Sequence, residues 1–242
     1  MISSAPTLHV LFTREALDPE RLPGKVVIAL DILFATSTIA YALAQGAGEL
    51  LLASGEDDAH RLAVEVESPL LAGEFNAETI CGFAPATPLA LAARGLRGRN
   101  LIYASTNGTR AVLQAASAAQ VYAASLLNGA AVARHVGSAY PQASVLLLCA
   151  GSLGRFNLED SYGAGHLAAH LLAQRDYVCS DATLAALRMR RGHEPLEVLA
   201  ESRIGRMMHA RGLAQEVVFA ARADTLGVVP MLTAGRRIRS AT

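Results

Sequence analysis

Short apolar runs alternate with alanine-rich or amphipathic segments along the first two thirds of the chain. The run at residues 25–31 is aliphatic and β-branched and ends on Asp31, which is typical of a strand covered on both faces. The same pattern predicts further strands at 8–12, 49–53, 69–74, 100–104, 120–123 and 143–149. Helices are predicted between them at 35–46, from 56, at 87–95, from 110, at 130–136 and up to about residue 173.

Strands and helices that alternate at this spacing predict an α/β fold of three α/β/α layers around a mostly parallel, mixed sheet. From residue 181 onward the pattern becomes helical, over 183–191, 195–201 and 204–211, before a last strand near 228–230. No linker rich in proline, glycine or serine and no internal repeat interrupts the chain. We therefore expect a single domain over residues 1–242 with a helical C-terminal third.

The charge pattern excludes several classes of protein. The 21 basic and 21 acidic residues balance to a net charge of +0, and no block of like charge stands out, so we expect neither a nucleic acid nor a membrane as partner. Lys25 is the only lysine and has no glycine-rich loop beside it, which disfavours P-loop and Schiff-base chemistry. The three cysteines lack zinc-type spacing and suit reduced thiols. With no signal peptide or membrane span indicated, we expect a cytoplasmic protein.

The stretch at residues 104–110 is the most informative in the chain. It is a polar turn, Ser105-Thr106-Asn107-Gly108-Thr109, between a predicted strand and a predicted helix. Such a turn presents hydroxyls and free backbone N–H groups in one concavity, which suits an anion. A role in turn formation alone is the simpler alternative.

Further polar residues follow other predicted strands. In an open parallel sheet the ligand binds outside the carboxyl ends of the strands, so we expect these residues to meet the stretch at 104–110. Carboxylates from separate strand ends suit Mg²⁺, while hydroxyls, amides and arginine suit an anion. The residues are Asp31 with Thr36, Ser37 and Thr38, Glu74 with Asn76, Asn128 with Gly129, and Gly151 through Arg155 to Glu159 and Asp160.

Some of these residues also have a plain structural interpretation or a competing chemical one. Asp31 is a candidate helix N-cap, and Glu159 and Asp160 lie in a first helical turn, where acids are favoured. Cys149 and Arg155 have the C-x5-R spacing of thiolate phosphatases, although Leu148 and Phe156 replace the usual flanking histidine and hydroxyl.

Two other motifs are weaker. An aspartyl phosphatase of the haloacid dehalogenase type would need a second aspartate where Leu33 stands. His166 and His170 have i, i+4 spacing without the acid of a zinc protease motif, and we interpret them as a helix surface or a partner contact, with metal binding as the weaker alternative.

Five blocks of this sequence resemble, in order and spacing, the 2-phosphosulfolactate phosphatase (ComB) family. They are the residues 31–38, 73–76, 105–110, 124–129 and 149–160. The resemblance implies a Mg²⁺-dependent phosphoric monoester hydrolase that converts 2-phosphosulfolactate to 3-sulfolactate, in coenzyme M synthesis or sulfolactate metabolism. The family motif carries arginine at two positions where this chain has Phe34 and Phe75, which removes two cations from the predicted anion site.

Together these observations give one hypothesis for a small phosphate ester as substrate. Asp31, Glu74 and Asp160 would hold Mg²⁺, and residues 105–109 would hold the phosphate. Arg155 would neutralise charge in the transition state, and Glu159 is a candidate base. The alternatives are a homologue that binds a small anion without catalysis and a thiolate phosphatase that uses Cys149 with Arg155. The alanine- and leucine-rich C-terminal third is compatible with a homodimer.

Overall fold

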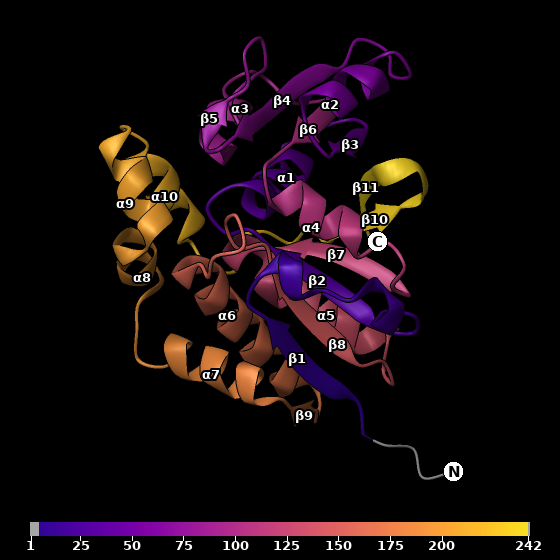
Figure 1. Cartoon of the computed structure of the whole chain (residues 1–242), viewed down its shortest axis with the longest axis vertical. Coiled ribbons are helices and arrows are strands. Elements are labelled where there is room, and N and C mark those ends of the chain that lie inside the picture. The colour runs from indigo at the N-terminus through magenta and orange to yellow at the C-terminus, as the bar shows by residue number, and fades with distance from the viewer. Residues whose placement is uncertain (1–4, 242) are drawn as a thin grey trace.

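The computed structural model describes residues 5–241 and shows an α/β fold. Its eleven strands form one mixed sheet in the order β5-β4-β6-β3-β11-β10-β7-β2-β8-β1-β9 (Figure 1). The strands are β1 (Thr7–Leu11), β2 (Val26–Leu30), β3 (Leu50–Ala53), β4 (Leu70–Phe75), β5 (Glu78–Thr79), β6 (Leu101–Ala104), β7 (Gln120–Ala124), β8 (Val145–Cys149), β9 (Val178–Cys179), β10 (Pro230–Thr233) and β11 (Arg237–Ser240).

Ten α-helices connect and flank these strands within residues 5–241. The α/β fold with a mostly parallel, mixed sheet is therefore confirmed, although the single domain over residues 1–242 stays a prediction. No helix of the described residues is long and apolar enough to cross a membrane. The helices are α1 (Ala35–Ala44), α2 (Glu56–Ala63), α3 (Pro88–Ala92), α4 (Gly108–Gln114), α5 (Gly129–Ala139), α6 (Leu158–Gln174), α7 (Asp181–Arg190), α8 (Pro195–Glu201), α9 (Arg203–Ala210) and α10 (Ala214–Ala220).

An antiparallel hairpin divides the sheet into two parallel sets of strands. β10 and β11 pair with each other, β10 pairs with β7, and β11 pairs with β3, all antiparallel (Figure 1). Three successive antiparallel pairings mean that β3 and β7 run in opposite senses. The strands are therefore parallel to one another only within two sets, β4-β6-β3 and β7-β2-β8-β1-β9.

The hairpin itself differs from the single strand expected near 228–230. Gly235 and Arg236 have φ values of 69° and 63°, so the chain turns through the left-handed region and returns as β11. Glycine tolerates this conformation without steric cost. The short strand β9 and the helix α10 were also missed by the sequence pattern.

The core lies around β2 and β8, in which every residue is buried. These strands pair in parallel, with Leu30 beside Cys149. In the other set, β4 pairs in parallel with β6, with Gly73 beside Ala104. A side chain at Gly73 would lie 2.3 Å from the Ala104 carbonyl oxygen, so glycine permits this close approach of the two strands.

Helix α10 fastens the helical C-terminal third to α3. Thr87 is the N-cap residue of α3 and Pro88 begins the helix, and the Thr87 hydroxyl donates to Glu216 Oε1 at 2.7 Å instead of capping its own helix. The Glu216 carboxylate also accepts the N–H groups of Leu89 and Ala90 at 2.9 and 2.8 Å. A residue of α10 thus satisfies the free N–H groups at the start of α3.

Candidate active site

Loops from both parallel sets and helix α9 enclose a cavity of about 180 Å³. A larger cavity of about 430 Å³ lies near β1 and contains none of the predicted site residues. The smaller cavity contains seven of them, and it is therefore the candidate active site. Its lining residues are Asp31, Phe34, Glu74, Asn76, Ala77, Thr106, Asn107, Gly151, Ser152, Leu153, Asn157, Glu159, Arg203, Ile204 and Met207.

Asp31 follows β2 and is held against the start of α4. A side chain at Gly108 would lie 2.2 Å from Asp31 Oδ2 and 2.5 Å from the Ala35 Cβ, so only glycine leaves room for the carboxylate. Burial, and then the neighbouring charges of Glu74 and Glu159, raise the pKa of Asp31 to about 7, against the opposing hydrogen bonds from the Ala35 and Gly108 N–H groups. A carboxyl in this state readily exchanges its proton for a cation near neutral pH.

Glu74 is buried and is fixed by donors from two loops. Its Oε1 accepts the Thr106 N–H at 2.6 Å, and its Oε2 accepts the Thr106 hydroxyl at 2.9 Å and the Ala77 N–H at 2.6 Å. Asn76 and Ala77 form the two-residue turn between β4 and β5, with φ values of 52° and 62°, as a type I′ hairpin requires. The Asn76 N–H donates to the Thr106 hydroxyl at 2.8 Å.

The two acids at the start of α6 have different surroundings. Glu159 lines the cavity, is 2% exposed, and its Oε2 has no hydrogen-bond partner within the described residues. Burial raises its pKa, although Ser202 and Arg203 oppose the shift. Asp160 does not line the cavity. Its Oδ1 accepts the Ile32 N–H at 3.0 Å and its Oδ2 the Gly151 N–H at 3.1 Å, so it ties together the loops that follow β2 and β8.

Most backbone N–H groups of the turn at residues 105–109 donate to acceptors within the protein, two of them to carboxylates, and few remain free for an anion. The Thr106 N–H donates to Glu74, and the Gly108 N–H points to Asp31. Ser105 and Thr109 bond to each other: the Ser105 N–H donates to the Thr109 hydroxyl at 3.1 Å and the Thr109 N–H to the Ser105 hydroxyl at 2.9 Å. The expected phosphate cradle of N–H groups is thus mostly occupied by the chain's own acceptors.

Several other predicted substrate-binding residues lie outside the cavity lining and bond to the backbone. The hydroxyl of Thr36 donates to the Asp31 carbonyl oxygen at 3.0 Å, that of Ser37 to Ile32, and that of Thr38 to Phe34 and Ala86. Asn128 Oδ1 accepts the Ser125 N–H at 2.8 Å. Gly129 begins α5. These residues shape the loops, and the structure does not bring them to the cavity.

The thiolate alternative is not supported by the positions of its two residues. Cys149 is completely buried and does not line the cavity, and burial raises the pKa of its thiol well above the usual value. Arg155 is exposed on the loop before α6 and is also absent from the lining. A nucleophilic cysteine needs a lowered pKa and access to the substrate, and Cys149 has neither.

The two phenylalanines at the family's arginine positions have different environments. Phe34 is buried and lines the cavity, whereas Phe75 is 60% exposed and does not. The prediction that both replacements lie at the anion site was therefore wrong for Phe75, because the turn after β4 directs Asn76 and Ala77 to the cavity instead. Phe34 places an apolar ring in the lining, at a position where the family resemblance implies an arginine.

Arg203 supplies a cation that the sequence pattern missed. It begins α9, lines the cavity, and its Nη2 donates to Asn157 Oδ1 at 3.0 Å. The predicted helix started at residue 204, one position late, and Ser202 is in fact its N-cap, accepting the Gly205 N–H at 2.9 Å. The sequence did contain a signal for this helix start, because serine is a preferred N-cap residue. That signal places Arg203 in the first turn of the helix, but it does not show that the helix lies at the cavity.

The cavity gathers carboxylate oxygens, which are the kind of ligand that a hard divalent cation takes. Asp31, Glu74 and Glu159 all line it, and the buried Oε2 of Glu159 has no hydrogen-bond partner within the described residues. Carboxylate oxygens are the protein ligands that Mg²⁺ prefers, and one or two of them suffice when water and substrate oxygens complete the shell.

Comparison with known proteins gives one consistent family. The family model described as 2-phosphosulpholactate phosphatase matches residues 11–235. A protein of Deinococcus radiodurans is 38% identical over 92% of this chain and 93% of its own, and one of Carboxydothermus hydrogenoformans is 34% identical over 92% of each. A Symbiobacterium thermophilum protein is 34% identical over 90% of this chain and 95% of its own. All three relatives are named probable 2-phosphosulfolactate phosphatase.

Proposed function

The chain belongs to the 2-phosphosulfolactate phosphatase family, and we propose that it hydrolyses 2-phosphosulfolactate, or a closely related phospho-acid, to the alcohol and inorganic phosphate. The substrate class rests on the names of the matched family and relatives. The observation that carries the proposal is the convergence of Asp31, Glu74 and Glu159 on one cavity.

Asp31 and Glu74 would hold Mg²⁺ in this proposal. When bound, the ion would polarise the phosphoryl oxygens and offset the charge of the substrate. Charge balance supports a cation: three acids and Arg203 line the cavity, and without a cation they would repel a phosphate dianion. Asp160, predicted as a ligand from sequence, would instead hold the loops, because it is absent from the cavity lining and its oxygens accept the Ile32 and Gly151 N–H groups.

Glu159 would take the proton of the attacking water through its free Oε2. A raised pKa suits a carboxylate to this role near neutral pH. Arg203 and Asn157, which are hydrogen-bonded to each other, would bind anionic oxygens of the substrate. Arg203, and not Arg155 as predicted from sequence, would neutralise charge in the transition state, because Arg155 is absent from the cavity lining.

Phosphate release from 2-phosphosulfolactate and a panel of small phospho-acids, in Mg²⁺ and in EDTA, tests this function. We expect turnover in Mg²⁺ and its loss in EDTA. Asp31→Asn should lower turnover about 100-fold or more, as removal of a group that stabilises transition-state charge does, whereas Asp57→Asn, a change on the exposed face of α2, should leave it unchanged. Full Mg²⁺-dependent turnover in Asp31→Asn would show the metal assignment to be wrong.

The second candidate function is anion binding without catalysis. The replacement of a family arginine by Phe34 in the cavity lining favours it. Calorimetric binding of a phospho-acid with no phosphate release under any metal condition would select this alternative.

The homodimer and the cytoplasmic location stay predictions. Light scattering of the purified protein tests the homodimer.

A further inference from the structure

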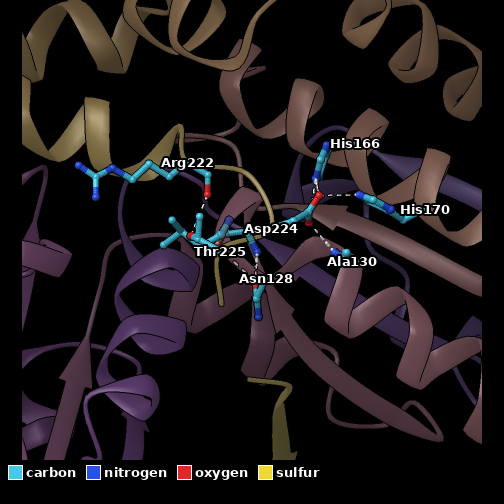
Figure 2. A network of polar contacts seen from close by, with 9 residues as sticks. Asn128, Ala130, His166, His170, Arg222, Asp224 and Thr225 are labelled. Atoms are coloured by element: carbon cyan, nitrogen blue, oxygen red, sulfur yellow. Dashed lines mark hydrogen bonds and ion pairs between the residues drawn. The ribbon is translucent and has the colours of Figure 1, made fainter. Parts of the chain in front are cut away.

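His166 and His170 both direct their Nε2 atoms at the carboxylate of Asp224 (Figure 2). Asp224 Oδ2 lies 3.2 Å from His166 Nε2 and 2.9 Å from His170 Nε2. One ligand atom from each of the three residues can be chosen so that all lie within 4.8 Å of one another. The i, i+4 spacing on α6, interpreted above as a surface or partner contact, thus gains a carboxylate from a segment 54 residues further along the chain.

We propose that His166, His170 and Asp224 form a second metal site, which binds a borderline transition ion such as Zn²⁺ or Co²⁺. Zinc lies about 2.0–2.2 Å from imidazole nitrogen and carboxylate oxygen, so tetrahedral ligand atoms around it are about 3.3–3.6 Å apart. The observed nitrogen–oxygen separations of 3.2 and 2.9 Å are slightly shorter, so a bound ion would need only a small outward shift of these side chains. Imidazole suits Zn²⁺, Co²⁺ and Ni²⁺, whereas Mg²⁺ prefers oxygen ligands, so this site and the carboxylate cavity select different ions.

The carboxylate is fixed in place before any ion binds. Asp224 adopts a left-handed backbone with φ of 58°, its N–H donates to the Leu126 carbonyl oxygen at 2.8 Å, and its Oδ1 accepts the Ala130 N–H at 2.7 Å.

The block at residues 124–129, which the candidate active site does not use, is built around this cluster. A side chain at Gly129 would lie 2.9 Å from His166 Cδ2, so glycine leaves the space that the imidazole occupies. Asn128 Nδ2 donates to the Val228 carbonyl oxygen at 3.2 Å, and the Leu226 N–H donates to the Leu127 carbonyl oxygen at 2.8 Å. These bonds fasten the segment that carries Asp224 beside α5 and α6 (Figure 2).

The cluster is separate from the carboxylate cavity. His166 lies seven residues after Glu159 on α6, which corresponds to about 10 Å along the helix axis. None of the three residues lines the cavity.

The rival explanation is a clamp in which the two imidazoles only hydrogen-bond to Asp224, and it predicts no metal binding.

Metal titration of tag-free, EDTA-treated protein separates the two explanations. Co²⁺ should bind in one equivalent with a visible absorption band of nitrogen ligation, Zn²⁺ should displace it, and excess Mg²⁺ should not. His170→Gln should weaken Co²⁺ binding at this site about 100-fold, while His209→Gln, on the exposed face of α9, should not change it. Asp31→Asn should abolish phosphatase turnover yet keep the Co²⁺ band, so the two sites are tested independently.

The proposal is overturned if the wild-type protein binds no Co²⁺ or Zn²⁺, if His170→Gln keeps the band, or if Asp31→Asn removes it. Circular dichroism checks that His170→Gln is folded. If it is not, anomalous scattering at the zinc edge from wild-type crystals decides: a peak between His166, His170 and Asp224 supports the site, and a peak elsewhere or none refutes it.

Discussion

Thr106 holds the Glu74 carboxylate twice, through its backbone N–H at 2.6 Å and its hydroxyl at 2.9 Å. The two residues come from β4 and from the loop after β6, strands that pair in parallel. A buried carboxylate needs such donors to replace the hydrogen bonds that it loses with water. The polar turn in the middle of the sequence therefore positions acids around the cavity, and the cavity's affinity for phosphate would depend on the cation that those acids hold.

Replacement of Thr106 by valine should disorder Glu74. The variant keeps the β-branched shape but leaves the Asn76 N–H without its acceptor and Glu74 Oε2 without one donor. We expect the free energy of unfolding to fall by about 1–3 kcal/mol and turnover to fall by about tenfold or more. Urea unfolding and phosphate release measure these effects. Thr106→Ser retains the hydroxyl and should lose much less of either, and equal losses in the two variants would contradict the role of this hydroxyl.

The raised pKa of Asp31 makes both stability and metal affinity depend on pH. Its folded value of about 7 exceeds the ordinary value of 3.8, so between about pH 4 and pH 7 the folded protein keeps a proton that the unfolded chain releases. Stability without metal should therefore decrease as pH rises through this window. Mg²⁺ competes with that proton, so its affinity should rise with pH and level off above about pH 7.

Scanning calorimetry in Mg²⁺ and in EDTA at pH 5.5 and pH 8 measures this coupling. Mg²⁺ should raise the melting temperature of the wild-type protein more at pH 8 than at pH 5.5. Asp31→Asn should remove most of that difference, because the asparagine has no proton to exchange. An equal Mg²⁺ effect at the two pH values in the wild-type protein would be evidence against Asp31 as a ligand.

The local pattern predicts the parts of the site that depend on neighbours in sequence. The apolar run before Asp31 forms β2, which ends one residue before this acid, and the run before Glu74 forms most of β4, which contains this acid near its end. Both acids line the cavity. A buried strand is recognisable because its two covered faces leave no polar positions. An acid at the carboxyl end of such a strand lies at the edge of the sheet, which is where ligands bind.

Contacts between distant segments were not predictable in this way. The hairpin of β10 and β11 reverses the sense of one parallel set, and no local signal marks it before residue 235. Arg203 lies on α9, which packs against α10, and Glu216 of α10 bonds to the start of α3. Asp224 likewise depends on a distant segment, because its pairing with His166 spans 58 residues. Periodicity identifies elements, whereas these residues depend on how the elements pack.

Gly108 should be irreplaceable for steric reasons. A Cβ at this position would lie 2.2 Å from Asp31 Oδ2 and 2.5 Å from the Ala35 Cβ, distances that force the carboxylate or the helix start to move. Gly108→Ala should lower turnover about 100-fold, since a displacement of about 1 Å at a reacting centre has that effect. Gly227→Ala is the matched control, because a Cβ there meets nothing within 4 Å. Similar turnover in the two variants would contradict the close contact with Asp31.

Arg203 and Arg155 give a paired test of which arginine binds the substrate. Arg203 lines the cavity and is oriented by its bond to Asn157, whereas Arg155 is exposed and is absent from the lining, although other residues of its loop belong to it. A hydrogen bond to a charged group contributes about 1.5–3 kcal/mol, so Arg203→Ala should raise KM about tenfold to a hundredfold.

Steady-state kinetics on both alanine variants and on Arg203→Lys measure this difference. Arg155→Ala should stay within about twofold of wild type, since exposed charges away from a ligand contribute little. Arg203→Lys should recover part of the affinity, because lysine keeps the charge but loses the planar pair of donors that arginine offers to an oxyanion. If Arg155→Ala instead has the larger effect on KM, the loop before α6 must fold over the cavity when substrate binds, and the sequence-based assignment of Arg155 would be restored.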